Sequence, residues 1–488
     1  MRPVEPALEQ FKQHHAAKKP QAVYTRLAGD LNTPVGAYLK LSAAFGAGFL
    51  LESVQGGSAR GRYSILGFSP DLVLRADKNR IELSRDGVPQ KINKPLFEVL
   101  RDMLAESRLD LPENLAPMSA GIFGVMGYDC VREFEKIGAD KPDPLSLPRA
   151  ILMRPTLVVV FDSVRDEIVL VTPVRDADNV EAAYKTADAK LRNAVGVLQK
   201  AAPETDKTPI TILAPTSNTK RDDYLAMVLQ AKEYIAAGDA FQIVLSQRFE
   251  IDFPLSSFEL YRALRSTNPS PYLFYFDFKD FALAGSSPEI CVQLSGDKVT
   301  LRPIAGTIRR GKTLAEDKML GEKLLNDPKE RAEHLMLLDL GRNDVGRVSE
   351  VGSIMVEEQF TLEHYSEVTH IVSQVSGKLK DGLDCIDVLA AAFPAGTVSG
   401  APKVRAMQII NELEKEQRGF YAGSAGYFSA NGDMDTAIIL RTGLVKDGKL
   451  YVQAGAGIVT DSVPESEQAE CEAKARALFR AAEVAGGA

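Results

Sequence analysis

Two segments of the sequence place glutamates three residues apart, a spacing that puts both side chains on one face of a helix. Glu330 and Glu333 lie in KERAEHLMLLDLGRND, and Glu467 and Glu470 lie in PESEQAECEAKARALFRAAEVAGG. Magnesium prefers carboxylate and water oxygens, so two such helices facing one pocket could hold this ion. Solvated helix faces that pair with nearby Lys or Arg explain the same spacing. The spacing permits a magnesium site but does not by itself reveal one.

Three glycine-rich turns form a second class of candidate site: residues 303–307 (PIAGT), 393–403 (FPAGTVSGAPK) and 453–459 (QAGAGIV). Glycine lets backbone N–H groups approach an anion, and neighbouring Thr and Ser hydroxyls add donors. Simple turns between elements are the alternative. None of the three matches GxxxxGK[ST] or GxGxxG, so no nucleotide-binding fold is indicated.

His370, in SEVTHIVSQVSG, has the side chain best suited to proton transfer near neutral pH. A histidine beside Val and Ile is also compatible with a packed or surface position. No Ser/His/Asp or Cys/His arrangement is evident from residue order. The four cysteines are far apart and form no CxxC pair, which argues against zinc or a disulfide framework: Cys130, Cys291, Cys385 and Cys471.

Short strands and helices must position these residues. Apolar residues at helical spacing predict a helix over residues 224–235, ended by Gly238, and a strand follows from Phe241. Both halves of the chain contain further strands joined by tight Gly or Asp-Gly turns, which favours antiparallel pairing. We therefore expect an α+β fold with large, mainly antiparallel sheets and outer helices.

A Pro-, Thr- and Ser-rich stretch at residues 200–218 predicts a boundary between two parts of the chain. We expect an N-terminal subdomain at residues 1–205 and a catalytic domain at residues 216–488. A length of 488 residues is compatible with two domains.

Composition excludes several classes of protein. With 45% hydrophobic and 25% charged residues the chain is typical of a soluble globular protein. Its net charge of -8 argues against nucleic-acid binding. No apolar stretch reaches the length of a membrane span and no signal peptide is recognisable, so we expect a cytoplasmic protein without membrane contact.

The motifs together resemble chorismate-utilising enzymes, and most closely the family of anthranilate synthase large subunits, or component I. The resemblance extends over about residues 50–482 and is strongest after Arg221. It rests on long motifs in one order: LLESV, GRYSILG, GDAFQIVLSQRF, NPSPYLFYF, GSSPE, RPIAGT, EHLMLLDLGRND, HIVSQVSG, FPAGTVSGAPK, RGFYAGSAGYF, DTAIILRT and QAGAGIV. It implies αββα layers with chorismate in a cleft between the sheets.

The resemblance also assigns roles to residues of the site. It implies Mg²⁺ bound by Glu333 and Glu470, with Glu330 and Glu467 nearby, either in direct contact or through water. Arg441 would bind a carboxylate through two parallel hydrogen bonds. The full substrate-binding set implied is Gly306, Thr307, Tyr421, Arg441, Gly455, Ala456 and Gly457.

The implied reaction is attack of ammonia at C2 of chorismate with loss of the C4 hydroxyl, then elimination of pyruvate to leave anthranilate. This is the first step of tryptophan biosynthesis, and its enzyme is a carbon–oxygen lyase that uses ammonia or glutamine. Because hydroxide leaves poorly, we expect Glu289 to act as a general acid if burial raises its pKa. Thr397 would position the reacting centre, and His370 would remove the C2 proton in the second step.

Two positions separate this chain from relatives with other activities. Isochorismate-forming relatives carry Lys where this sequence has Gln242, and aminodeoxychorismate synthases often carry Lys where it has Ala305. Both residues favour external ammonia at C2. Two alternatives stay open: an aminodeoxyisochorismate synthase without the lyase step, and a catalytically silent tryptophan-binding protein.

Regulation and a partner are also implied by the resemblance. LLES and NPSPY resemble the tryptophan feedback site, which places the inhibitor against Ser53, Pro271, Tyr272 and Leu273. Leu273 stands where Met is common, a volume-conserving change. We find no nucleophile-elbow cysteine segment, so glutamine-dependent activity is expected to require a separate glutamine amidotransferase subunit, component II, in a heteromer.

Overall fold

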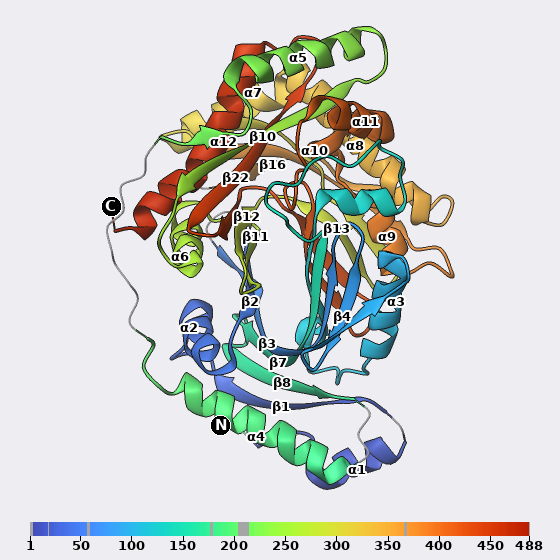
Figure 1. Cartoon of the computed structure of the whole chain (residues 1–488), viewed down its shortest axis with the longest axis vertical. Coiled ribbons are helices and arrows are strands. Elements are labelled where there is room, and N and C mark those ends of the chain that lie inside the picture. Colours follow the sequence, from blue (N-terminus) through green and yellow to red (C-terminus); the bar gives the residue numbers. More distant parts are fainter. Residues whose placement is uncertain are drawn as a thin grey trace.

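Helices and antiparallel strands make up the chain, as the sequence predicts. The computed structural model describes residues 3–17, 19–55, 59–175, 179–203, 214–365 and 368–487. Within these ranges the strand pairs run antiparallel. Figure 1 shows the strands stacked in the middle of the molecule with helices around them.

The first sheet joins the central part of the chain to its beginning and end. Its strands are, in spatial order, β9 (Thr216–Ser217), β10 (Gln242–Asp252), β22 (Lys449–Ile458), β21 (Thr442–Lys446), β12 (Ala282–Ser287), β11 (Tyr272–Asp277), β2 (Gly48–Gln55) and β3 (Ala59–Ala76). The short β18 (Gly400–Ala401) also pairs with β10. The sheet therefore depends on pairing between distant segments.

The second sheet shares the long β3 with the first. Its further strands are β4 (Ile81–Arg85), β5 (Val88–Ile92), β7 (Ala150–Asp162), β6 (Gly121–Met126), β19 (Ser424–Ser429), β20 (Met434–Ile438), β13 (Ile290–Ser295), β14 (Lys298–Leu301), β17 (Val368–Lys378), β15 (Ile304–Arg309) and β16 (Met355–His364). The far end of β7 pairs instead with β8 (Glu167–Val174), which pairs with β1 (Gln21–Ala28).

Three separate apolar cores establish the layers. Side chains such as Phe49, Phe123 and Phe276 pack between the two sheets. One outer core packs helices against β10 and β22, and another packs helices against β13 and β17. This order of helix, sheet, sheet and helix is the predicted αββα arrangement.

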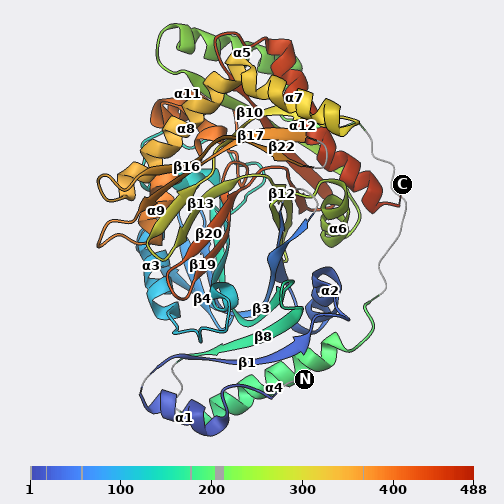
Figure 2. The same cartoon turned by 180° about the vertical axis from the view of Figure 1, so that it is seen from behind.

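The helices of the first outer core are α1 (Leu8–Ala16), α2 (Pro34–Phe45), α4 (Val180–Leu198), α5 (Arg221–Ala236), α6 (Ser257–Thr267) and α12 (Pro464–Ala485). The second outer core receives side chains from α3 (Leu96–Ser107), α8 (Pro328–Val348), α9 (Cys385–Ala392), α10 (Gly396–Ser399), α11 (Lys403–Leu413) and the 3-10 helix η2 (Tyr128–Glu133), and α7 (Leu314–Asn326) packs beside α8. Helix α11 also places Ile409 and Ile410 in the first outer core, and the 3-10 helix η1 (Pro117–Ser119) places Met118 in the core between the sheets. Figure 2 shows α7 and α8 lying along β16 and β17.

Local sequence signals explain the helices that border the site. Proline occupies the first turn of both α8 and α12, where its missing N–H costs no hydrogen bond. Asp327 caps α8 by accepting hydrogen bonds from the N–H groups of Lys329 and Glu330. The predicted helix at residues 224–235 lies within α5, and the predicted strand from Phe241 is β10.

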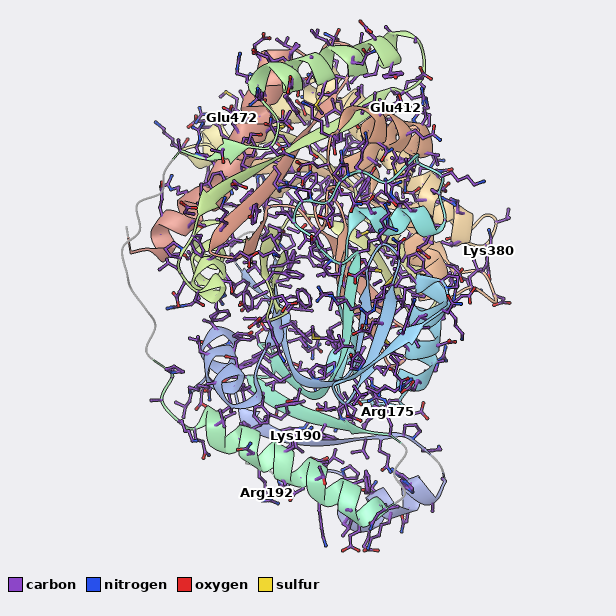
Figure 3. All side chains as sticks on the ribbon, viewed as in Figure 1. Arg175, Lys190, Arg192, Lys380, Glu412 and Glu472 are labelled. Carbon is purple, nitrogen blue, oxygen red and sulfur yellow. The ribbon has the colours of Figure 1, made fainter. Side chains whose placement is uncertain are left out.

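Charged side chains of the outer helices face solvent. Figure 3 shows Arg192 on α4, Glu412 on α11 and Glu472 on α12 at the outside of the molecule, and all three are exposed. Among the residues described, no helix combines the length and the apolar character that crossing a membrane requires.

Strands of the two predicted parts of the chain pair directly with each other. β2 pairs with β11, and β6 pairs with β19. Most of the predicted boundary at 200–218 falls on residues 204–213, which lie outside the described residues. Division of the chain there stays a prediction.

Candidate functional site

A cavity of about 930 Å³ lies between β10 and β22 of the first sheet and β15 and β17 of the second. We call it the Arg441 cavity. It is lined by Val244, Pro288, Glu289, Ile304, Ala305, Thr307, His370, Thr397, Val398, Tyr421, Leu440, Arg441, Val452, Gln453, Ala454, Gly455, Gly457 and Lys474. The fold thus assembles predicted site residues from seven separate segments of the chain.

Arg441 brings positive charge into this cavity. It follows β20 in a left-handed backbone conformation with φ of 45°, which non-glycine residues rarely adopt. Burial lowers the pKa of its guanidinium. No ion pair of Arg441 is found among the described residues, although its planar fork suits a carboxylate. An anionic ligand would compensate this cation.

Glu289 contributes an acid to the cavity. Its side chain is only 7% exposed, and burial raises its pKa to about 8, against the influence of the Thr397 hydroxyl and the Ile304 N–H. Thr397 Oγ1 is itself buried without a hydrogen-bond partner of good geometry in the described parts of the chain. At neutral pH Glu289 is therefore mainly protonated and able to donate a proton.

His370 contributes a base. Its ring is 6% exposed, and burial lowers its pKa, so the neutral imidazole predominates near pH 7. Nδ1 lies 2.8 Å from the carbonyl oxygen of Gly306 and 3.1 Å from Oγ1 of Thr307. A carbonyl only accepts, so Nδ1 carries the proton and Nε2 keeps its lone pair.

Glycines form the wall that β22 presents. A Cβ on Gly455 would lie 2.6 Å from the Leu245 carbonyl oxygen and 2.8 Å from the Tyr421 hydroxyl, so no larger residue fits without displacement. A Cβ on Gly457 would likewise lie 2.7 Å from Nε2 of Gln242. These contacts let the backbone approach a bound molecule closely.

Two residues of the predicted substrate set do not line the cavity directly. Ala456 is fully buried between Gly455 and Gly457. Gly306 acts instead through its carbonyl on His370, and its positive φ of 66° favours glycine. A Cβ on Gly306 would lie 3.1 Å from Glu330, which places α8 next to the cavity.

Four glutamates of α8 and α12 lie next to the Arg441 cavity, on the side of Gly306. Burial and neighbouring glutamates raise the pKa of Glu330 and Glu333, and burial followed by Glu470 raises that of Glu467. This repulsion places the four carboxylates near one another, and we call them the glutamate cluster. Within the described residues no three His, Cys, Asp or Glu side chains are close enough to form a complete metal site.

Lys474 is a cavity residue that the sequence analysis missed. Its Nζ donates to the Gly455 carbonyl oxygen at 2.9 Å and pairs with Glu470 at 2.7 Å. It connects the cavity to the glutamate cluster. Its position one helical turn after Glu470 was the available signal. Gln453, which donates to Ser246 at 2.9 Å, was also missed.

A second pocket of about 750 Å³ lies elsewhere between the sheets, and we call it the Ser53 pocket. It contains Ser53, Tyr272 and Leu273 of the predicted feedback site, but not Pro271. Its lining residues are Leu51, Glu52, Ser53, Arg62, Tyr63, Ile65, Met118, Tyr272, Leu273, Phe274, Ala425, Gly426, Tyr427, Asp435 and Ala437. Ser53 and Tyr272 are direct partners in the β2–β11 register.

One carboxyl group distinguishes the Ser53 pocket and was not expected from sequence. Asp435 accepts hydrogen bonds from Tyr272 Oη and Gln293 Nε2, both at 3.3 Å. Burial raises its pKa to about 6. The pocket thus combines aromatic walls with two buried acids, Asp435 and Glu52, of which Glu52 is paired with Arg265 at 2.7 Å.

Known proteins share this architecture. The family model for chorismate binding enzymes matches residues 84–480. The menaquinone-specific isochorismate synthase from Escherichia coli has a TM-score of 0.72 at 19% identity, covering 98% of this chain and 99% of its own, which shows a common fold.

Two relatives are more similar. Anthranilate synthase component 1 of Cereibacter sphaeroides is 49% identical, and the match covers 98% of both chains. The crystal structure of anthranilate synthase component I from Streptococcus pneumoniae has a TM-score of 0.79 at 37% identity, covering 93% of this chain and 99% of that one. The chain therefore belongs to the anthranilate synthase component 1 family of chorismate-binding enzymes.

Proposed function

We propose that this chain converts chorismate and ammonia to anthranilate, pyruvate and water. The observation that carries the proposal is the Arg441 cavity, where one unpaired cation, one protonated acid and one neutral base face the same space. Chorismate is a dianion, and Arg441 supplies a partner for one of its carboxylates. Gln242 and Ala305 leave both lysine positions of other family activities without an amine.

Amination is the first step of the proposed reaction. The ammonia lone pair forms a bond to C2 of chorismate, the ring double bonds shift, and the C4–oxygen bond breaks. Glu289 donates its proton to the leaving oxygen, so water departs instead of hydroxide. The proton that the new ammonium group releases restores the proton balance.

Elimination is the second step. His370 Nε2 removes the proton from C2 while the C3–oxygen bond breaks, and the ring becomes aromatic. The departing enolpyruvate takes up a proton to give pyruvate. The hydrogen bond to Gly306 holds the imidazole in the tautomer that this step needs. A working His370 favours this product over aminodeoxyisochorismate, the alternative that stops after amination.

We further propose that the glutamate cluster binds Mg²⁺ through Glu333 and Glu470, with Glu330 and Glu467 next to them. Hard carboxylate oxygens in mutual repulsion suit this ion. Bound there, Mg²⁺ would neutralise the carboxylates and attract the ring carboxylate of chorismate.

A glutamine amidotransferase subunit is the proposed source of ammonia. Relatives carry the name component 1, which implies a second component. The cysteines in the described residues are all free, which fits a reducing cytoplasmic location for the complex.

The Ser53 pocket is the proposed site of tryptophan inhibition. Its aromatic walls can enclose an indole ring, and the Asp435 carboxyl faces the same space and suits an ammonium group. A catalytically silent tryptophan-binding protein would share this pocket but would not need the acid and base of the Arg441 cavity.

Anthranilate fluorescence tests the proposal. Purified chain is mixed with chorismate, Mg²⁺ and ammonium at alkaline pH, and then with glutamine in place of ammonium. We expect fluorescence from ammonium alone and none from glutamine without a partner. Chorismate consumption without fluorescence would indicate the amination-only alternative, and no consumption would indicate the silent binder.

A further inference from the structure

Glu289 and Thr397 line a second, smaller pocket in addition to the Arg441 cavity. This pocket has a volume of about 360 Å³, and we call it the Asp344 pocket. Its wall also contains Gly341 and Asp344 of α8 and the side chain of Arg302. Because the pocket is an open space, close packing does not fix Glu289 and Thr397 on this side, and other contacts must do so.

The wall of the Asp344 pocket contains buried polar atoms without partners. Thr397 Oγ1, Asp344 Oδ1 and Arg302 Nε are each buried, and none has a hydrogen-bond partner of good geometry among the residues described. The whole Asp344 side chain is 5% exposed. Water can enter a polar pocket of this size and satisfy such atoms, but a mobile water does not hold a side chain in place.

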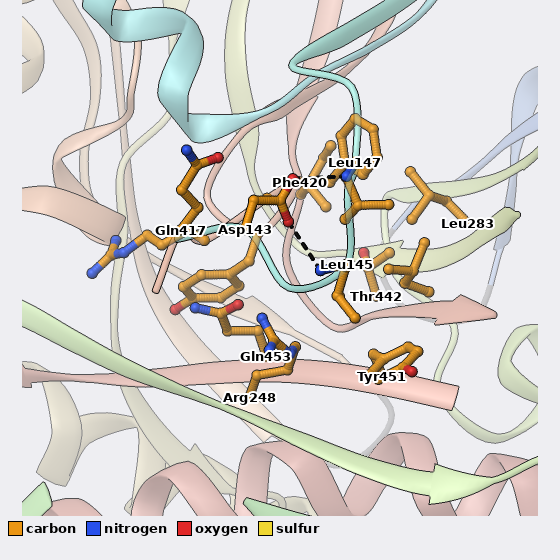
Figure 4. A pocket seen from close by; sticks show the side chains of 15 residues that line it. Asp143, Leu145, Leu147, Arg248, Leu283, Gln417, Phe420, Thr442, Tyr451 and Gln453 are labelled. Atoms are coloured by element: carbon orange, nitrogen blue, oxygen red, sulfur yellow. Dashed lines mark hydrogen bonds between the residues drawn. The ribbon is translucent and has the colours of Figure 1, made fainter. Parts of the chain in front are cut away.

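Another pocket of the molecule has a different polar wall. Figure 4 shows this pocket, where the Asp143 carboxylate accepts the N–H groups of Leu145 at 3.1 Å and Leu147 at 2.8 Å. In the part of the chain that the structure describes, none of the buried side-chain polar atoms that line it lacks a partner. Unpartnered polar atoms are therefore not a general property of the pockets of this protein.

Lys403 connects α8 to the end of α9 beside the Asp344 pocket. Its Nζ pairs with Oδ2 of Asp344 at 2.7 Å and donates to the carbonyl oxygen of Ala392 at 3.0 Å. The Lys403 side chain is only 9% exposed. A cation is favourable at the last carbonyl groups of a helix, so Lys403 fixes the point where the chain leaves α9.

The chain leads from this point directly to the proposed proton donor. Residues 393–396 separate Ala392 from Thr397, and Gly396 packs on α8, since an added Cβ would overlap Cδ2 of Leu340. Burial raises the pKa of Glu289, and the Thr397 hydroxyl opposes this rise as a hydrogen-bond donor. A displacement of the end of α9 would therefore reach Glu289 through Thr397.

We propose that Lys403 and Asp344 are positioning residues for Glu289, because their ion pair fixes the end of α9 and so holds Thr397 against the acid. The inference rests on the proposed function, in which Glu289 donates the proton of the amination step. Neither Lys403 nor Asp344 lines the Arg441 cavity. Helix α8 also carries Glu333, about 16 Å before Asp344 along the helix, so one helix positions both the proposed metal ligand and the acid.

Replacing both partners, Asp344→Asn with Lys403→Met, tests this role without leaving a buried charge unpaired. In the ammonium assay, kcat should fall about 10²-fold, as expected when a reacting group is misplaced by about 1 Å. The KM for chorismate and the Mg²⁺ concentration for half-maximal activity should stay within about twofold, which also shows that α8 is folded. Arg101→Met is the matched control, because Arg101 pairs with Asp384 at 2.9 Å at the start of the same helix, α9, and its loss should leave kcat unchanged.

Thr397→Val shows whether the ion pair acts through Thr397. Added to Thr397→Val, the double replacement should lower kcat by less than about threefold more, because the contact that it disturbs is already lost. A double variant with kcat within about threefold of wild type would overturn the positioning role, as would a full 10²-fold further loss on the Thr397→Val background or an equal loss in Arg101→Met. Absence of anthranilate from the wild type would instead refute the proposed function, and the positioning role with it.

Discussion

The Arg441 cavity and the Ser53 pocket lie in the same layer between the two sheets, yet their walls differ in chemistry. The cavity contains an unpaired arginine, a protonated glutamate and a neutral histidine. The pocket contains aromatic rings and two carboxyl groups, Asp435 and Glu52, and Glu52 is already paired with Arg265 at 2.7 Å. Both spaces are enclosed because they lie between the sheets. Only the Arg441 cavity combines an acid and a base with an unpaired cation, so only this cavity is suited to transfer protons.

Replacing the acid should give the largest effect. Glu289→Gln keeps the shape but removes the proton donor, so kcat should fall about 10³-fold with little change in the KM for chorismate. Steady-state anthranilate fluorescence checks this, and tryptophan inhibition of residual activity should persist. A kcat within about tenfold of wild type would show that Glu289 is not the proton donor. The proposed chemical difference between the Arg441 cavity and the Ser53 pocket would then be lost.

The same residue predicts a pH dependence. The pKa of Glu289 is about 8, so kcat at saturating ammonium should decline above that pH in the wild type. Because burial raises the pKa of Glu289 in the folded state, the protonated carboxyl is compatible with the folded chain and the carboxylate opposes folding. The free energy of unfolding is therefore highest below the unfolded pKa of about 4.5, and this advantage is lost as the pH rises through the folded pKa of about 8. Thermal unfolding of Glu289→Gln should lack this loss.

Loss of the base should separate the two steps. His370→Ala removes Nε2, so anthranilate formation should slow about 10²-fold while chorismate is still consumed. Chromatography should then detect the amino intermediate. Anthranilate release at the wild-type rate would assign the base to another residue.

The glutamate cluster should control the requirement for magnesium. Glu333→Gln should raise the Mg²⁺ concentration for half-maximal activity about tenfold or more, because it removes one charged ligand. Glu472→Gln is the control, since this exposed residue lies on the outer face of α12. Equal magnesium titrations for both variants would contradict the assignment.

The smallest effect on turnover is expected in the Ser53 pocket. Ser53 packs tightly against Gly61, because a Cβ added to Gly61 would lie only 1.7 Å from the Ser53 hydroxyl. Ser53→Phe should therefore overfill this site. Overpacking of this kind costs about 1–3 kcal/mol, so half-inhibition should need about tenfold more tryptophan, with kcat almost unchanged. Unchanged inhibition would place the effector elsewhere.

Periodicity and motifs predicted the fold class and eight of the eighteen residues that line the Arg441 cavity. Helix α5 and strand β10 follow from local apolar spacing, and Pro464 suits the first turn of α12, where the structure places it. Lys474 and Asp435 were missed because their roles depend on which helix or strand lies opposite, and local spacing carries no such information.

The pairing of β11 with β12 connects the Ser53 pocket to the Arg441 cavity. Tyr272 of the Ser53 pocket pairs with Ser287, and Glu289 follows two residues later, about 7 Å along an extended chain. The carbonyl oxygen of Glu289 also accepts from the N–H of Ile438, next to Ala437 of the same pocket. A molecule that shifted either strand would displace the backbone of the proposed proton donor, so the proposed inhibitor could act here without resembling the substrate or competing for its space.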